Sequence, residues 1–358
     1  MKHFILTAAA LLSASASLGA TEVLTSPDGR LRLSVGVTPS GRVFYTLRAD
    51  GQTVVDTSYV SIDMREGAVG RASKVASVSH SAFDETWSLP WGEESEVRNH
   101  YNEMRVDLTE DGSDVKNYSL VFRLFDDGLG FRYEIPRQAS LDSVTILNED
   151  SQFRISEDAV AWAQPAGPEY YEYLYKPSPL SRLDTVSTPL TMKVTDNLYL
   201  SIHESNIIDY AEMNLCPDSA TTTLHSCLTP WSTGEKVFAA LPLATPWRTV
   251  TVAASPGDLA LSRLTLNLAD PCKIEDTSWI EPGRYVGIWW GMHMKDWTWS
   301  SGPKHGATTE NAKRYIDFAA ENGYSGVLVE GWNKGWDGDW TANGDKFSFT
   351  EAYPDFDI

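Results

Sequence analysis

The sequence is poor in cysteine, poor in basic residues and free of long apolar runs. It has 3 Cys among 358 residues, too few for a disulfide-rich scaffold or a cysteine-based zinc site. Its 29 Lys and Arg are outnumbered by 49 Asp and Glu, and the net charge of −20 argues against nucleic acid, which is bound through clustered basic side chains. No segment approaches the roughly 18 consecutive apolar residues of a membrane span. With 42% hydrophobic and 22% charged residues, the composition is that of a folded globular protein.

The cysteines leave one pairing open. Cys216 and Cys227 flank a polar stretch and could close a hairpin through a disulfide in an oxidising compartment. Their spacing does not decide whether they do. The remaining thiol, Cys272, is expected to be a small buried apolar side chain.

Residues 1–20 have the composition of a secretory signal peptide. Lys2 supplies a basic start, residues 4–12 are apolar, and small residues follow. The apolar stretch is too short for a membrane span and lacks the polar face of a surface helix. We therefore expect cleavage after Ala16 or Ala20 and a periplasmic or secreted mature protein.

Residues 21–270 consist of short strand-like segments separated by turn signals. Segments 30–37 and 42–49 alternate in polarity or are rich in β-branched and aromatic residues. Asp50-Gly51 and Asp111-Gly112 are typical hairpin pairs. Further strands are predicted at 118–125, 131–136, 190–195, 198–205, 236–243 and 248–255. Because no amphipathic helix pattern interrupts them, the region is predicted to be a large antiparallel β-sandwich.

The pattern changes after Asp276. Residues 285–290 and 324–330 are continuous apolar runs, as in parallel strands covered on both faces. Between them, Thr308 resembles a helix cap, apolar residues recur at helical spacing, and Gly323 resembles a C-cap. A (β/α)8 barrel needs roughly 250 residues, so 276–358 is expected to be its first, incomplete portion. The alternative is a sandwich with a short α/β appendage.

Tryptophan is concentrated in this second region. Indole rings stack on the C–H faces of pyranose rings, so Trp-rich loops suit carbohydrate. Trp332 and Trp336 follow the end of a predicted parallel strand, where barrel enzymes place active-site loops, and are predicted to contact substrate. One of Trp289 and Trp290 is expected to lie in the core. The residues concerned are Trp279, Trp289, Trp290, Trp297, Trp299, Trp332, Trp336 and Trp340.

Polar side chains accompany these tryptophans. Glu330 ends the second predicted strand, and Asn333 and Asp337 follow it. Such residues can contact substrate hydroxyls, although a solvated loop acid is an equal alternative for Glu330. For His293 and His305 a functional role and a structural one are equally open.

One glutamate in the predicted sandwich adjoins a histidine. Alternation places His203 and Glu204 on opposite faces of their strand. A glutamate in a strand is usually a surface residue, so spacing alone assigns Glu204 no function.

Together these segments resemble glycoside hydrolase family 97. The resemblance covers essentially the whole predicted mature chain and is most specific between residues 304 and 333. The matching motifs are Trp91-Gly92-Glu93, Arg98-Asn99, Gly128-Leu129-Gly130-Phe131-Arg132-Tyr133, Ile202-His203-Glu204, Asp209-Tyr210, Asp276-Thr277-Ser278-Trp279-Ile280, Pro282-Gly283, Lys304-His305-Gly306-Ala307-Thr308-Thr309-Glu310-Asn311, Arg314-Tyr315-Ile316-Asp317-Phe318-Ala319-Ala320, Val329-Glu330-Gly331-Trp332-Asn333 and Gly335-Trp336.

The resemblance implies a sandwich of the galactose-mutarotase type, followed by a catalytic barrel that hydrolyses α-glycosides with calcium as cofactor. It implies that Glu204 is the calcium ligand supplied by the sandwich, and that Glu330, Trp332, Asn333 and Trp336 bind the oligosaccharide substrate. The catalytic carboxylates are expected beyond the end of this chain, so the chain as given is expected to be inactive.

The early barrel motifs resemble an inverting, calcium-dependent α-glucosidase acting on malto-oligosaccharides. Three alternatives stay open: a retaining α-galactosidase of the same family, a carbohydrate-binding sandwich without catalysis, and a mutarotase-like or epimerase-like sandwich. The last would need a histidine and carboxylate set on one face, and its candidates are His100, His203 and His225.

Overall fold

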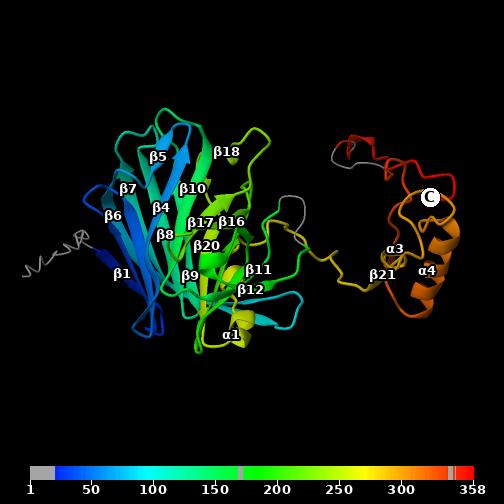
Figure 1. The fold of residues 1–358 in the computed structure, drawn as a ribbon, viewed down its shortest axis with the longest axis horizontal. Helices are drawn as coiled ribbons and strands as arrows, with labels where there is room; N and C mark the ends of the chain where they lie inside the picture. The colour runs from blue at the N-terminus through cyan, green and yellow to red at the C-terminus, as the bar shows by residue number, and fades with distance from the viewer. Residues whose placement is uncertain (1–20, 168–171, 338–341, 343) are drawn as a thin grey trace, which may run out of the picture. The chain divides into compact units, whose positions relative to one another are not determined.

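The computed structural model describes residues 21–167, 172–337, 342 and 344–358 (Figure 1). The predicted signal peptide and its cleavage sites lie outside the described residues. Contacts divide the chain into two compact units, Met1–Pro271 and Cys272–Ile358. Each unit has its own buried apolar cluster.

The first unit contains two antiparallel sheets, each with ten strands among the described residues. The first sheet runs in the order β1-β2-β3-β4-β10-β17-β16-β13, with β5 on β4 and β18 on β10. Its strands are β1 (Thr21–Thr25), β2 (Leu31–Val37), β3 (Val43–Ala49), β4 (Gln52–Met64), β5 (Gly67–Val69), β10 (Ser143–Ile155), β13 (Val186–Ser187), β16 (Met213–Pro217), β17 (Thr223–Leu228) and β18 (Val237–Ala240).

The second sheet runs in the order β12-β11-β14-β15-β20-β9-β8-β7-β6, with β19 on β9. Its strands are β6 (Ser73–Ser88), β7 (Glu96–Glu110), β8 (Asn117–Phe125), β9 (Gly128–Ile135), β11 (Val160–Ala163), β12 (Lys176–Pro179), β14 (Leu190–Thr195), β15 (Leu198–Ser205), β19 (Leu243–Ala244) and β20 (Trp247–Ala253). A short 3-10 helix, η1 (Leu180–Arg182), follows β12.

Aromatic side chains from both sheets meet in the core. Tyr45 of β3 and Phe153 of β10 come from the first sheet, and Phe122 of β8 and Phe131 of β9 come from the second. The Phe131 ring lies 5.3 Å from Tyr45, 5.8 Å from Phe122 and 6.1 Å from Phe153, and all four side chains are buried. Each contributes roughly 1.5–3 kcal/mol through burial. Two sheets joined in this way form a β-sandwich, as the sequence predicts.

The individual strand predictions hold for most of the sandwich. The predicted strands 190–195 and 198–205 coincide with β14 and β15. The predicted strand 236–243 is wrong, because it divides into β18, which pairs with the first sheet, and β19, which pairs with the second. Pro242 lies between them and has no N–H for a strand ladder.

Two short helices close the sandwich unit where only strands and turns were predicted. They are α1 (Pro256–Leu261) and α2 (Leu264–Leu268). Ser255 caps α1, since its side chain accepts a hydrogen bond from the Asp258 N–H, and proline stands at the first helical position. Figure 1 shows α1 at one end of the strands.

The three cysteines are free thiols. Cys216 lies on β16 and Cys227 on β17, and the disulfide that the sequence left open between them is not formed. Cys272 is exposed, so the expectation that it is buried is wrong.

The second unit is built on two parallel strands and a helix. Strand β21 (Tyr285–Gly287) pairs with β22 (Gly326–Leu328), and α4 (Thr309–Glu321) contacts both. The predicted helix start is confirmed, because the Thr308 side chain accepts from the Asn311 N–H. Gly323 follows with φ +68°, the left-handed conformation of a C-cap glycine. The unit also has a short helix, α3 (Trp289–His293), and a 3-10 turn, η2 (Gly344–Lys346).

The apolar run at 285–290 is not one strand. It changes from β21 into α3 after Ile288, and Trp289 and Trp290 are 43% and 62% exposed, so the expectation that one of them lies in the core is wrong. Both strands are also shorter than predicted and only partly buried. A short apolar run does not by itself distinguish a strand from a helical turn. None of the helices in the described part of the chain is long and apolar enough to cross a membrane.

Candidate functional site

The loop after β22 carries the four predicted substrate contacts Glu330, Trp332, Asn333 and Trp336. Two glycines shape it, Gly331 with φ +87° and Gly335 with φ +91°. A side chain is strained in this region of φ. At Gly335 a Cβ atom would also lie 2.3 Å from the Lys346 carbonyl oxygen.

Both predicted stacking residues lie against another aromatic ring. Trp332 stacks on Phe356, with ring centroids 5.7 Å apart and an interplanar angle of 28°. Trp336 stacks on Trp299 at 5.9 Å and 25°. Both indoles are half-buried. The aromatic neighbours fix the orientation of each ring while leaving part of it accessible.

The polar residues of the loop differ in how many hydrogen bonds they already make within the protein. Asn333 is 7% exposed and pairs with Ala352 in an isolated β-bridge. The Asp337 carboxylate accepts from the Ser301 N–H at 3.2 Å. The half-buried Glu330 carboxylate makes no hydrogen bond or ion pair with any residue that the structure describes. Glu330 is therefore better placed than Asp337 to receive a ligand hydroxyl.

His305 contacts the backbone of this loop. Its ring is buried, with Nδ1 2.8 Å from Asp355 Oδ2 and Nε2 2.9 Å from the Gly331 carbonyl oxygen. The two partners are oxygen atoms, one of a carboxylate and one of a backbone carbonyl. His305 thus fixes the backbone between Glu330 and Trp332. His293 lies exposed on α3, 3.8 Å from the Trp289 ring.

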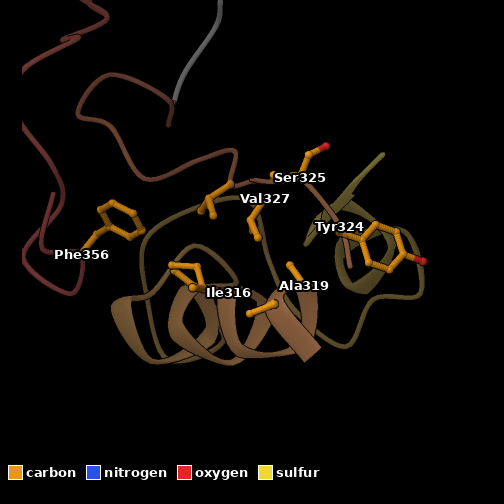
Figure 2. Close-up of a pocket in the computed structure, with 10 residues that line it drawn as sticks. Ile316, Ala319, Tyr324, Ser325, Val327 and Phe356 are labelled. Carbon is orange, nitrogen blue, oxygen red and sulfur yellow. The ribbon is translucent and has the colours of Figure 1, made fainter. Parts of the chain in front are cut away.

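An open groove of about 430 Å³ lies elsewhere in the second unit. Figure 2 shows Ile316 and Ala319 of α4 facing Val327 of β22, with Phe356 at one end. Its described lining contains no charged side chain and none of the four predicted substrate residues. Its apolar character suits packing rather than recognition of a polar sugar.

The glutamate matched to calcium lies in the first unit. Glu204 is 4% exposed, so the expectation of a surface strand residue is wrong. Oε1 accepts from the Met213 N–H at 2.9 Å, and Oε2 accepts from Arg248 Nη1 at 2.5 Å. His203 lies on the opposite face, as alternation predicts, in a small pocket with Thr191 and Ser201.

Arg248 binds a second buried glutamate as well. Its Nε and Nη2 both donate to Glu149 at 2.7 Å, and Tyr210 donates to Glu149 at 2.8 Å. Burial favours a higher pKa for Glu149, but Arg248 outweighs it and holds that pKa below its usual value. Burial raises the pKa of Glu204, and Arg248 offsets only part of that effect. One guanidinium thus serves two buried carboxyl groups.

The described residues do not complete a calcium site. Calcium takes about six to eight oxygen ligands. Among residues 21–167, 172–337, 342 and 344–358, no three His, Cys, Asp or Glu side chains gather as a metal site. Both oxygens of the buried Glu204 carboxyl group already accept hydrogen bonds, one from the Met213 N–H and one from Arg248. The sequence did not lead us to expect Glu149 and Arg248 as partners of Glu204. Arg248 could have been noticed, because it lies in β20, whose other residues suit a completely buried strand.

The histidines of the mutarotase-like alternative do not form one set. His225, on β17 of the first sheet, pairs with Asp150 at 2.7 Å. His203 and His100 belong to the second sheet, where β20, β9 and β8 separate β15 from β7. His203 Nδ1 is 3.2 Å from the Thr188 hydroxyl, and burial lowers its pKa.

Comparison with protein families decides the relationship that the motifs suggest. Residues 24–271 match the profile described as Glycosyl-hydrolase 97 N-terminal, and residues 289–358 match Glycoside hydrolase 97. The chain belongs to glycoside hydrolase family 97. The first match falls on the sandwich unit, and the second contains α3, α4 and β22. In this family 97 chain, the β-sandwich is thus followed by a short start of the catalytic domain.

Solved structures and curated relatives agree on the family. A family 97 enzyme from Pseudoalteromonas sp. in complex with acarbose is 41% identical, with a TM-score of 0.87 over 94% of this chain and 51% of that chain. A variant of that enzyme in complex with panose gives the same values. A retaining alpha-galactosidase from Bacteroides thetaiotaomicron is 27% identical over 86% of this chain and 50% of its own length. The family 97 chain therefore spans about half the length of these relatives.

Proposed function

We propose that the whole protein is an inverting, calcium-dependent α-glucosidase that shortens malto-oligosaccharides in the periplasm. The activity is assigned to the whole protein because this chain spans about half the length of its relatives. The observation that carries the proposal is the 41% identity to a family 97 enzyme in complex with acarbose, against 27% to a retaining alpha-galactosidase. The panose complex of the same neighbour also supports an oligosaccharide substrate.

The loop after β22 supports a role in sugar binding. Trp332 and Trp336 are held by aromatic neighbours, and half-buried indoles of fixed orientation can stack on pyranose rings. The Glu330 carboxylate is available to accept from a sugar hydroxyl, and His305 fixes the adjoining Gly331. Each of these residues binds the substrate or orients a residue that does.

Hydrolysis needs two further carboxyl groups, one to protonate the leaving oxygen and one to activate water. Glu204 is proposed as the sandwich-supplied ligand of calcium, which would offset negative charge in the active site. In this chain Arg248 and the Met213 N–H hold the Glu204 carboxylate in place.

A retaining alpha-galactosidase is the second candidate. Two relatives favour it by their names. The protein from Bacteroides thetaiotaomicron, named a retaining alpha-galactosidase, is 27% identical. The protein from Streptomyces bingchenggensis, named a probable retaining alpha-galactosidase, is 28% identical. A carbohydrate-binding sandwich without catalysis is less well supported, since it leaves the catalytic-domain match at 289–358 without a function.

Proton NMR of the first sugar released by the whole protein separates these functions. Inversion of maltose hydrolysis yields β-glucose before mutarotation, because water attacks the face opposite the leaving group. Initial β-glucose is the expected result. Initial α-glucose, or faster turnover of an α-galactoside than of maltose, would overturn the proposal.

A further inference from the structure

A polar pocket lies on the face of the second sheet that is turned away from the core. The strand registers pair Thr191 of β14 with Ser201 of β15, and Ser201 with Thr251 of β20. Directly paired residues point to the same side of a sheet, with Cβ atoms about 4.5–5.5 Å apart. Val250 and Val252, which alternate with Thr251, belong to the core. Three hydroxyl groups thus form a row across three strands and line a pocket of about 330 Å³.

A second polar row lies two residues further along the same strands. His203 of β15 also lines the pocket, and its direct partner on β20 is Thr249. Thr249 is completely buried, and its hydroxyl has no hydrogen-bond partner among the residues that the structure describes. Buried polar groups without a partner are uncommon in folded proteins. The polar surface therefore extends from the pocket to a hydroxyl whose hydrogen bond the described protein does not supply.

The His203 ring is arranged to accept a hydrogen bond. The Thr188 hydroxyl has a single hydrogen, which it donates to the Met213 carbonyl oxygen at 3.1 Å. It therefore accepts from His203 Nδ1, which is 3.2 Å away. Burial lowers the pKa of His203 and favours the neutral ring, in which Nε2 is then the acceptor. Nε2 makes no hydrogen bond with any residue that the structure describes.

Two short helices supply the remaining wall of the pocket. Helices α1 and α2 both contact β15 and β20, and Leu259 of α1 and Thr265 of α2 line the pocket. Leu264 and Leu268 of α2 share a buried apolar cluster with Trp247 of β20, which holds this helix on the sheet. The described lining combines hydroxyl groups and one imidazole with proline, leucine and alanine, and it includes no charged side chain.

We propose that this pocket in the first unit is a binding site for a neutral pyranose sugar. Hydroxyl groups both donate and accept hydrogen bonds, and His203 Nε2 accepts, which suits a ligand that carries several hydroxyls. The volume of about 330 Å³ lies within the range of small-molecule sites, roughly 300–1,000 Å³. An ionic ligand is disfavoured, because a charge removed from water needs a charged partner, and none lines the described pocket.

The test titrates the 358-residue chain with D-glucose in saturation-transfer difference NMR. Thr251→Val keeps the shape of the side chain but removes its hydroxyl, so the Kd for glucose should rise about fivefold. Thr86→Val, at an exposed position of β6, is the matched control and should leave the Kd unchanged. D-glucuronate, a sugar of similar shape that carries a carboxylate, should bind more weakly than glucose.

A second background separates this pocket from the loop after β22. Trp332→Ala removes one proposed stacking residue, and the effect of Thr251→Val should persist in that background. Disappearance of the effect there would assign the signal to the loop, overturning the pocket proposal while supporting the proposed function. No binding of glucose, equal binding of glucuronate, or an unchanged Kd in folded Thr251→Val would also overturn the proposal. If Thr251→Val fails to fold, Ser201→Ala removes the neighbouring hydroxyl and provides the same test.

Discussion

Arg248 Nη1 donates a hydrogen bond to Glu204 Oε2 at a distance of 2.5 Å, and both side chains are almost completely buried. The same guanidinium binds Glu149 through its other two donors. Glu204 is thus held by an arginine that is itself fixed by a second carboxylate. This arrangement orients the residue proposed as a calcium ligand.

Replacing Arg248 with methionine should strongly destabilise the sandwich. The change leaves Glu149 and Glu204 buried without their cation, and breaking a buried pair in this way costs roughly 3–5 kcal/mol. Urea unfolding followed by circular dichroism measures the loss. The control is Arg30→Met, which removes an exposed pair with Asp50 and should change the unfolding free energy little. Equal losses in the two variants would contradict a structural role for the cluster.

Calcium affinity should distinguish Glu204 from Glu149 in the whole protein. Glu204→Gln removes the proposed ligand and should weaken calcium binding by more than about tenfold in isothermal titration calorimetry. Glu149→Gln also disturbs Arg248 but keeps the Glu204 carboxylate, so its calcium affinity should change less. Both variants should lose stability. Unchanged calcium affinity in folded Glu204→Gln would reject the assignment.

The Asp150–His225 pair should make stability depend on pH. Hydrogen bonding to Asp150 raises the pKa of His225 above 6.5, so its contribution is complete below 6.5 and disappears as pH rises through the raised pKa. Burial opposes ionisation of Asp150, but the hydrogen bond with His225 holds the Asp150 pKa below 3.8. The stabilisation that comes from Asp150 is therefore complete above pH 3.8 and is lost as the pH falls through the lowered pKa. Asp150→Asn should therefore cost more stability at about pH 5 than at about pH 9.

Denaturant titrations at these two pH values provide the measurement. Asp50→Asn is the control, since its partner Arg30 stays charged throughout and its effect should be constant over the range. An Asp150→Asn effect that does not shrink as pH rises would show that the pair contributes nothing through charge.

Removing either proposed stacking residue should impair substrate binding by the whole protein. Trp332→Ala and Trp336→Ala each delete an oriented half-buried ring, and losing one stacking contact of about 1.4 kcal/mol lowers kcat/KM about tenfold. Initial rates with maltotriose measure the effect. Trp279→Ala is the control, because Trp279 is 69% exposed in the same unit. An equal loss in all three variants would indicate a general structural effect.

Local sequence features predicted much of the fold. Alternating polarity predicted β14 and β15 with their observed bounds, since a half-buried strand imposes a two-residue period. The Thr308 cap and Gly323 predicted α4, because unsatisfied helix ends select these residue types. The motifs around Glu330 predicted the family. In each case the information lies within a short stretch of chain.

The tertiary structure alone decided the interactions between distant segments. Glu149 is separated from Arg248 by 99 positions and Glu204 by 44, and only the assembled sheets bring the three together. His305 reaches Gly331 and Asp355 in the same way. The run at 285–290 became a strand and a helical turn because its apolar composition satisfies either conformation. Backbone preference is local and can be read along the chain, whereas the partner of a buried charge depends on where the packed elements place it.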